Sequence, residues 1–287
     1  METKNLKWVL LAAMALIWGS SFILIKKGLI GLDPYQLGSL RMIFAAVFLL
    51  VIGFKKIPQI PRDKWKFMFL TAFLGIFLPA YLFALAETKI GSSITGVLNS
   101  LTPLNSLIFG ILIFGLNFKR IQIIGVSIGF LGSLMLVFTG NTQTTSNFGY
   151  VFLVFIATLC YALNVNIVKK YLSDLNALTI ATGNSAAMIL PAFVILCCTG
   201  FFEVMHLPQV QHSVLFILVL GVFGTGIANL LFFRLIQMSS TVFATSVTYL
   251  IPIVAFFWGL LDNEMLSLLQ FAGACVIIFG VWLSGKK

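Results

Sequence analysis

Long apolar runs follow one another along the chain and are separated by short polar connections. Each run holds about 18–24 residues, the length that a helix needs to cross a hydrocarbon core of roughly 30 Å. The chain is 60% hydrophobic and only 9% charged, whereas soluble domains carry roughly a quarter of charged residues. We therefore predict an all-α integral membrane protein of ten transmembrane helices. The expected spans are 7–25, 35–54, 65–86, 92–114, 121–138, 148–168, 176–199, 213–236, 240–261 and 267–284.

The connections between these runs are too short to hold a soluble domain, so any chemistry takes place at or inside the membrane. The formal net charge of +10 would suggest a nucleic-acid partner in a soluble protein. Here most lysines and arginines fall on the side of the N-terminus, and the positive-inside rule places that side in the cytoplasm. An even number of spans puts both termini there. We expect membrane lipid and a small-molecule substrate as partners, and no nucleic acid.

An internal repeat relates the two halves of the sequence. At an offset of 143 positions Trp18 matches Tyr161, Ser21 matches Asn164, and Lys26–Lys27 match Lys169–Lys170. At an offset of 149 positions Asn99 matches Thr248, Pro103 matches Pro252, Gly75 matches Gly224 and Phe83 matches Phe232. Two copies of one segment indicate that the chain arose from a duplicated unit.

Each half holds five spans, with the first half at 1–138, a polar linker at 139–147 and the second half at 148–287. Because five is odd, the second half enters the membrane from the opposite side. We predict two inverted five-helix repeats around a central cavity, the architecture of carriers that work by alternating access. One chain contains both halves, so a monomer suffices for function.

Polar and aromatic side chains inside the spans are the candidates for the wall of this cavity, because a polar group in lipid needs a partner or water. For a single serine or threonine, a hydrogen bond between helices is the favoured alternative. Asparagine bonds back to its own helix less readily, which favours the cavity. The predicted substrate-binding residues are Trp18, Ser21, Tyr81, Asn99, Pro103, Tyr161, Asn164, Asn229, Thr248, Tyr249 and Pro252.

Amide and hydroxyl groups beside aromatic rings suit a small amphipathic metabolite. We expect the fourth and ninth helices to bend at Pro103 and Pro252 and to close the two mouths of the cavity in turn. Arg41 lies within the second span, about two turns from its outer end. It either extends its guanidinium to the interface or supplies a positive charge at the external mouth that attracts a carboxylate.

Several kinds of site are missing from the sequence. The spans carry no Asp or Glu at their centres, which disfavours proton antiport through a central acid. The chain has no Walker-type phosphate loop, so ATP does not drive it directly. Its four cysteines have no metal-ligand spacing with a histidine. We therefore expect no catalytic residues, no metal and no cofactor, and downhill export or exchange.

The string ALIWGSSF at 15–22, followed by Pro34 and Arg41, resembles the drug/metabolite transporter superfamily. The pairs Thr102–Pro103 and Ile251–Pro252 are similar to its fourth and ninth spans, and within the superfamily the chain resembles the bacterial EamA-type ten-helix permeases. The resemblance implies a carrier in the bacterial inner membrane that exports amino acids or related metabolites. Two other classes stay open: an integral-membrane enzyme acting on a lipid-like substrate, and a structural or receptor-like membrane protein.

Overall fold

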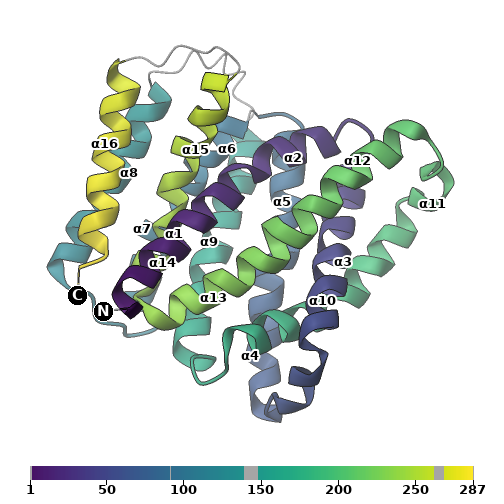
Figure 1. Cartoon of the computed structure of the whole chain (residues 1–287), viewed down its shortest axis with the longest axis horizontal. Helices are drawn as coiled ribbons and strands as arrows, with labels where there is room; N and C mark the ends of the chain where they lie inside the picture. The colour runs from purple at the N-terminus through teal and green to yellow at the C-terminus, as the bar shows by residue number, and fades with distance from the viewer. Residues whose placement is uncertain (1, 91, 139–147, 262–267, 287) are drawn as a thin grey trace.

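The structure is a computed structural model that describes residues 2–90, 92–138, 148–261 and 268–286. Within these ranges the chain forms helices and turns and no strand, which confirms the all-helical class (Figure 1). The linker predicted at 139–147 lies outside the described residues. Helices occupy all the stretches that the sequence predicts to be spans, and their ends differ from the predicted ones by a few residues.

Six helical stretches are long and apolar enough to cross a membrane: Asn5–Gly28, Pro34–Gln59, Arg62–Glu87, Phe148–Tyr171, Ala177–Cys198 and Pro208–Met238. The first stretch consists of α1 (Glu2–Gly19) and α2 (Ser21–Gly28), and the second of α3 (Pro34–Gly53) and η1 (Phe54–Gln59). The third consists of η2 (Arg62–Lys64), α4 (Trp65–Ala72), η3 (Phe73–Phe77) and α5 (Leu78–Glu87). The fourth is α9 (Phe148–Tyr171), the fifth is α10 (Ala177–Cys198), and the sixth consists of α12 (Pro208–Val219), η4 (Leu220–Ile227) and α13 (Ala228–Met238).

The remaining helices are shorter: α6 (Ser92–Asn99), α7 (Thr102–Leu112), α8 (Arg120–Phe138), α11 (Phe201–Val204), α14 (Thr241–Thr245), α15 (Val247–Leu261) and α16 (Leu268–Ser284). That these apolar helices cross the bilayer too stays a prediction. Many large side chains on the outside of the bundle are apolar, as a lipid-facing surface requires: Val51 is 78% exposed, Leu112 77% and Leu190 68%.

The two predicted proline bends differ in the structure. In the first half the helix breaks at Ser100–Leu101, and Pro103 lies in the first turn of α7, where its missing N–H is not needed. In the second half the break between α14 and α15 lies at Ser246, whereas Pro252 is inside α15. The discontinuities are therefore not at the prolines, and in the second half the break precedes the proline by more than a turn.

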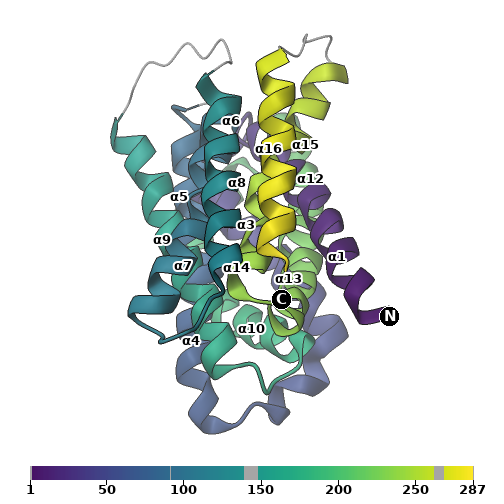
Figure 2. The same ribbon diagram turned by 90° about the vertical axis from the view of Figure 1, so that its left-hand side faces the viewer.

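Helices α8 and α16 pack along each other at one side of the molecule (Figure 2). Glycines make this approach possible, because a Cβ added at Gly125 would lie 2.7 Å from the Gly280 carbonyl oxygen. A Cβ at Gly132 would lie 2.8 Å from the backbone nitrogen of Ile277. Small residues that let two backbones meet are the usual basis of helix association in lipid. No described residue of either helix is among those that line the cavity described below.

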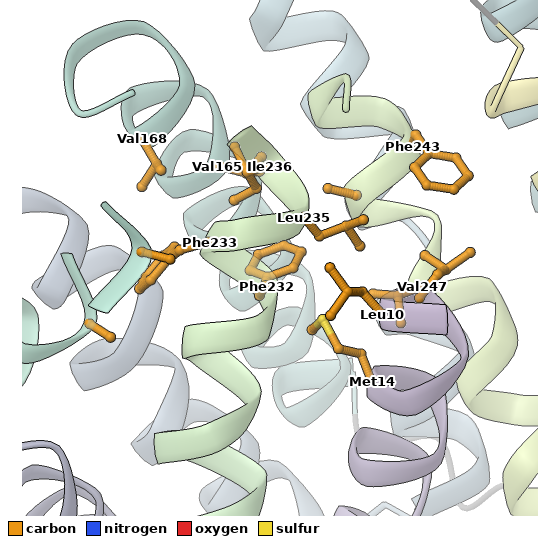
Figure 3. Close-up of a cluster of buried hydrophobic side chains, with 14 of the residues drawn as sticks. Leu10, Met14, Val165, Val168, Phe232, Phe233, Leu235, Ile236, Phe243 and Val247 are labelled. Atoms are coloured by element: carbon orange, nitrogen blue, oxygen red, sulfur yellow. The ribbon is translucent and has the colours of Figure 1, made fainter. Parts of the chain in front are cut away.

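The largest group of buried apolar side chains joins α1, α9, α13, α14 and α15. Figure 3 shows Met14, Val165, Phe232 and Phe243 of this cluster converging from different helices. Nearby, the Lys7 Nζ donates a hydrogen bond of 2.7 Å to the Gly285 carbonyl. The first turns of α1 and the residue that follows α16 therefore lie at the same end of the bundle.

We expect Gly280→Ala to destabilise the protein by about 1–3 kcal/mol, because its new Cβ would clash with the backbone of α8 at Gly125 and Gly129. The measurement is the melting temperature in detergent. Gly149→Ala is the matched control, since a Cβ there meets no heavy atom within 4 Å. Equal melting temperatures for the two variants would contradict this account of the α8–α16 contact.

Candidate functional site

A cavity lies between helices of the first and second halves of the chain. Its volume of about 80 Å³ exceeds severalfold the roughly 10–15 Å³ that one water molecule needs on this measure. The cavity can therefore hold water or part of a polar solute. It is lined by Trp18, Ser21, Phe22, Ile25, Arg41, Gly75, Ile76, Ala80, Phe83, Asn99, Thr102, Tyr161, Asn164, Gly224, Thr225, Asn229, Phe232, Thr245, Thr248 and Ile251.

Two aromatic pairs form much of the apolar wall, and each pair joins one half of the chain to the other. The rings of Trp18 on α1 and Phe232 on α13 meet edge to face, with centroids 5.1 Å apart. The rings of Phe83 on α5 and Tyr161 on α9 are stacked, with centroids 5.9 Å apart. Such contacts are worth about 0.5–1.5 kcal/mol beyond the burial of area. They create an apolar, polarisable surface for the body of a ligand.

Two π-helical segments border the cavity. The segment η3 contributes Gly75 and η4 contributes Gly224, and both glycines allow a close approach from the opposite half. A Cβ at Gly75 would lie 2.8 Å from the Asn164 Oδ1, and a Cβ at Gly224 would lie 2.9 Å from the Ser21 Oγ. The Trp18 Nε1 donates to the Gly224 carbonyl at 3.0 Å. Single π turns inside longer helices are frequent at functional sites.

The polar wall consists mainly of amides and hydroxyls. The Thr102 hydroxyl donates to the Asn99 Oδ1 at 3.2 Å, and the Thr248 hydroxyl donates to its own helix at the Thr245 carbonyl. Asn164 is only 3% exposed. Its Oδ1 is buried and accepts no hydrogen bond from the described part of the chain. A buried acceptor of this kind is unfavourable unless water or a ligand satisfies it.

Arg41 is on the wall of the cavity, and its side chain is partly buried. The Nε donates to the Thr225 Oγ1 at 2.7 Å, which ties α3 to η4. It is the one charged side chain among the described lining residues. That this cation supplies a positive charge at the external mouth stays a prediction.

Seven predicted binding residues line the cavity: Trp18, Ser21, Asn99, Tyr161, Asn164, Asn229 and Thr248. The other four do not: Tyr81, Pro103, Tyr249 and Pro252. The Tyr81 hydroxyl is hydrogen-bonded to Ser39 at 2.9 Å, and the Tyr249 hydroxyl donates to the Val126 carbonyl of α8 at 3.0 Å. Both prolines are buried. A substrate-binding role for the residues that do line the cavity stays a prediction.

Sequence reasoning passed over several lining residues, although the repeat carried a signal for four of them. Phe83 with Phe232, and Gly75 with Gly224, are matched positions of the two halves. Apolar and small residues inside a span are common, so their type alone did not single them out. Thr225 was one of many hydroxyls within spans, and nothing in the sequence tells that it contacts Arg41.

The wall provides hydrogen-bond donors, acceptors and aromatic surface, and the described lining residues include no carboxylate, histidine, lysine or cysteine. Within the described residues no group of three or more His, Cys, Asp or Glu is placed to hold a metal ion. The donors, acceptors and aromatic surface of the wall are suited to contact a small amphipathic molecule.

The apolar exterior and the membrane-length helices define a multi-pass membrane protein, and a partly polar cavity lies inside it. The family model described as the EamA-like transporter family matches the chain twice, at residues 6–138 and 148–285. The chain belongs to this family and is a membrane transporter. This confirms membership of the drug/metabolite transporter superfamily.

Individual proteins share this similarity over nearly their whole length. The chain is 29% identical to the Escherichia coli protein named uncharacterized inner membrane transporter YedA, over 95% of this chain and 88% of that protein. It is 23% identical to the S-adenosylmethionine/S-adenosylhomocysteine transporter of Chlamydia muridarum, over 85% and 80% of the two chains. A crystal structure with 14% identity matches the fold with a TM-score of 0.74, over 96% of this chain and 94% of that one.

We expect Thr248→Cys to react with a membrane-impermeant methanethiosulfonate reagent, because Thr248 lines the cavity. Ser246→Cys is the matched control, since Ser246 is fully buried, donates to the Phe243 carbonyl and does not line the cavity. Both variants are made after the four native cysteines are replaced by alanine. Labelling at equal rates would show that the cavity does not admit water.

Proposed function

We propose that this transporter is a carrier that moves small amphipathic metabolites by alternating access, as ten spans in two inverted five-helix repeats. The observation that carries the proposal is the pairing across the cavity. Trp18 contacts Phe232 while Tyr161 contacts Phe83, and Trp18–Tyr161 and Phe83–Phe232 are matched positions of the sequence repeat. A contact and its mirror image support a pseudo-twofold axis through the cavity, as in carriers built from inverted repeats.

The glycine contacts support the same axis. Gly75 approaches Asn164, and its counterpart Gly224 approaches Ser21, the counterpart of Asn164. Both contacts bring a π-helical segment of one half against a helix of the other half. A rocking motion of the two halves would exchange these related contacts, so the repeat offers two states of similar energy.

The two ends of the cavity differ in one kind of hydrogen bond. The Lys169 Nζ donates to the carbonyls of Ile236 at 2.9 Å and Ser239 at 2.8 Å, which caps the end of α13. The matched residue Lys26 is exposed and makes no hydrogen bond or ion pair with the described parts of the chain. We infer that the Lys169 end is closed here, and that Lys26 forms the related contacts when the opposite end closes.

The substrate class follows from the wall and the family. Amides and one guanidinium beside aromatic rings suit amino acids or related metabolites, and the Chlamydia relative is named for a transported organic metabolite. The lysine and arginine distribution supports cytoplasmic termini, and the E. coli relative's name supports the inner membrane. Export is the direction that the resemblance to EamA-type permeases implies. Transport in this proposal needs no ATP hydrolysis. The alternative, a membrane enzyme acting on a lipid-like substrate, would have to work without a carboxylate, histidine, lysine or cysteine among the described lining residues.

We expect Asn99→Leu to lower flux by about tenfold or more, because it removes an amide from the cavity wall that pairs with Thr102. The measurement is uptake of a radiolabelled panel of amino acids and related metabolites into proteoliposomes. Asn117→Leu makes the same change at an exposed position and is the control. Undiminished flux in Asn99→Leu would exclude this residue from the site, and no flux of any solute in the unmodified protein would count against the carrier.

We expect Lys169→Met to favour the state open at the N-terminal side, because it removes the cap on α13. The readout is the labelling rate of the Thr248→Cys reporter from each face of oriented membrane vesicles. Lys169→Met should raise labelling from the cytoplasmic face, whereas the matched Lys26→Met should not. The same labelling pattern in both variants would rule out Lys169 as a closing contact.

A further inference from the structure

Arg41 has binding capacity that the protein does not use. Its Nε donates to Thr225, and the terminal guanidinium nitrogens have no hydrogen-bond or ion-pair partner within the described ranges. The described ion pair, Lys64–Asp174, lies elsewhere. Glu87 attracts Arg41 electrostatically and does not line the cavity. A cation beside apolar walls is unfavourable without an anion or water at hydrogen-bond distance.

We propose that Arg41 pairs with a carboxylate of the transported solute, so that the cavity selects monoanionic or zwitterionic carboxylates with an apolar or aromatic body. A guanidinium holds a carboxylate with two parallel hydrogen bonds, and the Thr225 contact fixes the orientation of its plane. Arg41 is the one cation on the described wall, with no second positively charged group beside it. The wall therefore suits a single negative charge better than a phosphate dianion.

The surroundings of Arg41 determine the rest of the solute. Trp18, Phe83 and Phe232 provide aromatic surface for an apolar body. The Asn164 Oδ1 is a buried acceptor without a donor in the described part of the chain, so it fits an ammonium or N–H group on the solute. Tyr161 and Asn164 are one turn apart on α9, and both line the same cavity as Arg41. A solute that carries both a carboxylate and an N–H donor, such as an amino acid, has a partner for each of these groups.

This inference rests on the proposed function in taking the cavity as the substrate site, and binding tests it separately from transport. The probes are two acid–amide pairs, phenylalanine with phenylalaninamide and phenylacetate with phenylacetamide, measured by thermal shift and equilibrium binding in nanodiscs. We expect the acids to bind the unmodified protein roughly ten- to a hundredfold more tightly than the amides, as hydrogen bonds to a charged group imply.

Arg41→Gln should reduce this acid-over-amide preference to about one, while Arg41→Lys should keep part of it, because an ammonium retains the charge without the fork. Arg234→Gln, at an exposed position of α13, is the matched control and should keep the full preference. If Arg41→Gln does not fold, the affinity ratio of acid to amide in Arg41→Lys decides. A ratio in Arg41→Lys equal to that of the unmodified protein overturns the inference.

Amides that bind as tightly as the acids, or an acid preference that survives Arg41→Gln, would also overturn it. Proteoliposome flux of the same acids separates the two proposals. Acid binding that depends on Arg41 without any flux would contradict the carrier and leave the assignment of Arg41 standing. Flux of neutral solutes that Arg41→Gln does not alter would contradict the role of Arg41 and leave the carrier standing.

Discussion

Polar groups inside a bilayer have no bulk water to satisfy them, and this constraint organises the structure. Many asparagine, serine and threonine side chains of the helices are buried, where side chains from other helices or trapped water can pair with them. Large apolar side chains such as Val51 and Leu112 are exposed on the outside. Because many spans carry a few polar residues each, their polar sides meet in one cavity between the two halves.

Close helix contacts make this arrangement possible, and they are of two kinds. Between α8 and α16, glycines bring two backbones together far from the cavity, which produces a firm contact of small residues. At the cavity, Gly75 and Gly224 instead admit polar side chains from the opposite half. The first kind of contact is suited to hold a fixed pair of helices. The second kind leaves a polar boundary along which two halves can move without exposing a hydrophobic core to water.

The sequence was sufficient to predict the helices and much of the cavity wall. Length and apolarity determine the spans, and the offsets of 143 and 149 positions link residues such as Trp18 and Tyr161 that the structure places around one cavity. The sequence did not indicate which side of its helix each side chain occupies. Tyr81 and Tyr249 are aromatic and polar like the lining residue Tyr161, but their hydroxyls bond to Ser39 and to the Val126 carbonyl. Side-chain partners on other helices, such as the Thr225 hydroxyl that Arg41 contacts, are not encoded in local sequence.

The π-helical segments make the cavity depend on the hydrogen-bond register of a helix as well as on its sequence. A π turn holds one more residue than an α turn, so η4 accommodates an extra residue within its turns. If η4 became α-helical with the same number of residues, the downstream residues would rotate by about 100° and move along the axis by about 1.5 Å. Asn229 and Phe232 follow η4 and would then turn away from Trp18 and Arg41. A local change of hydrogen-bond register in η4 would therefore replace side chains on the cavity wall without any substitution.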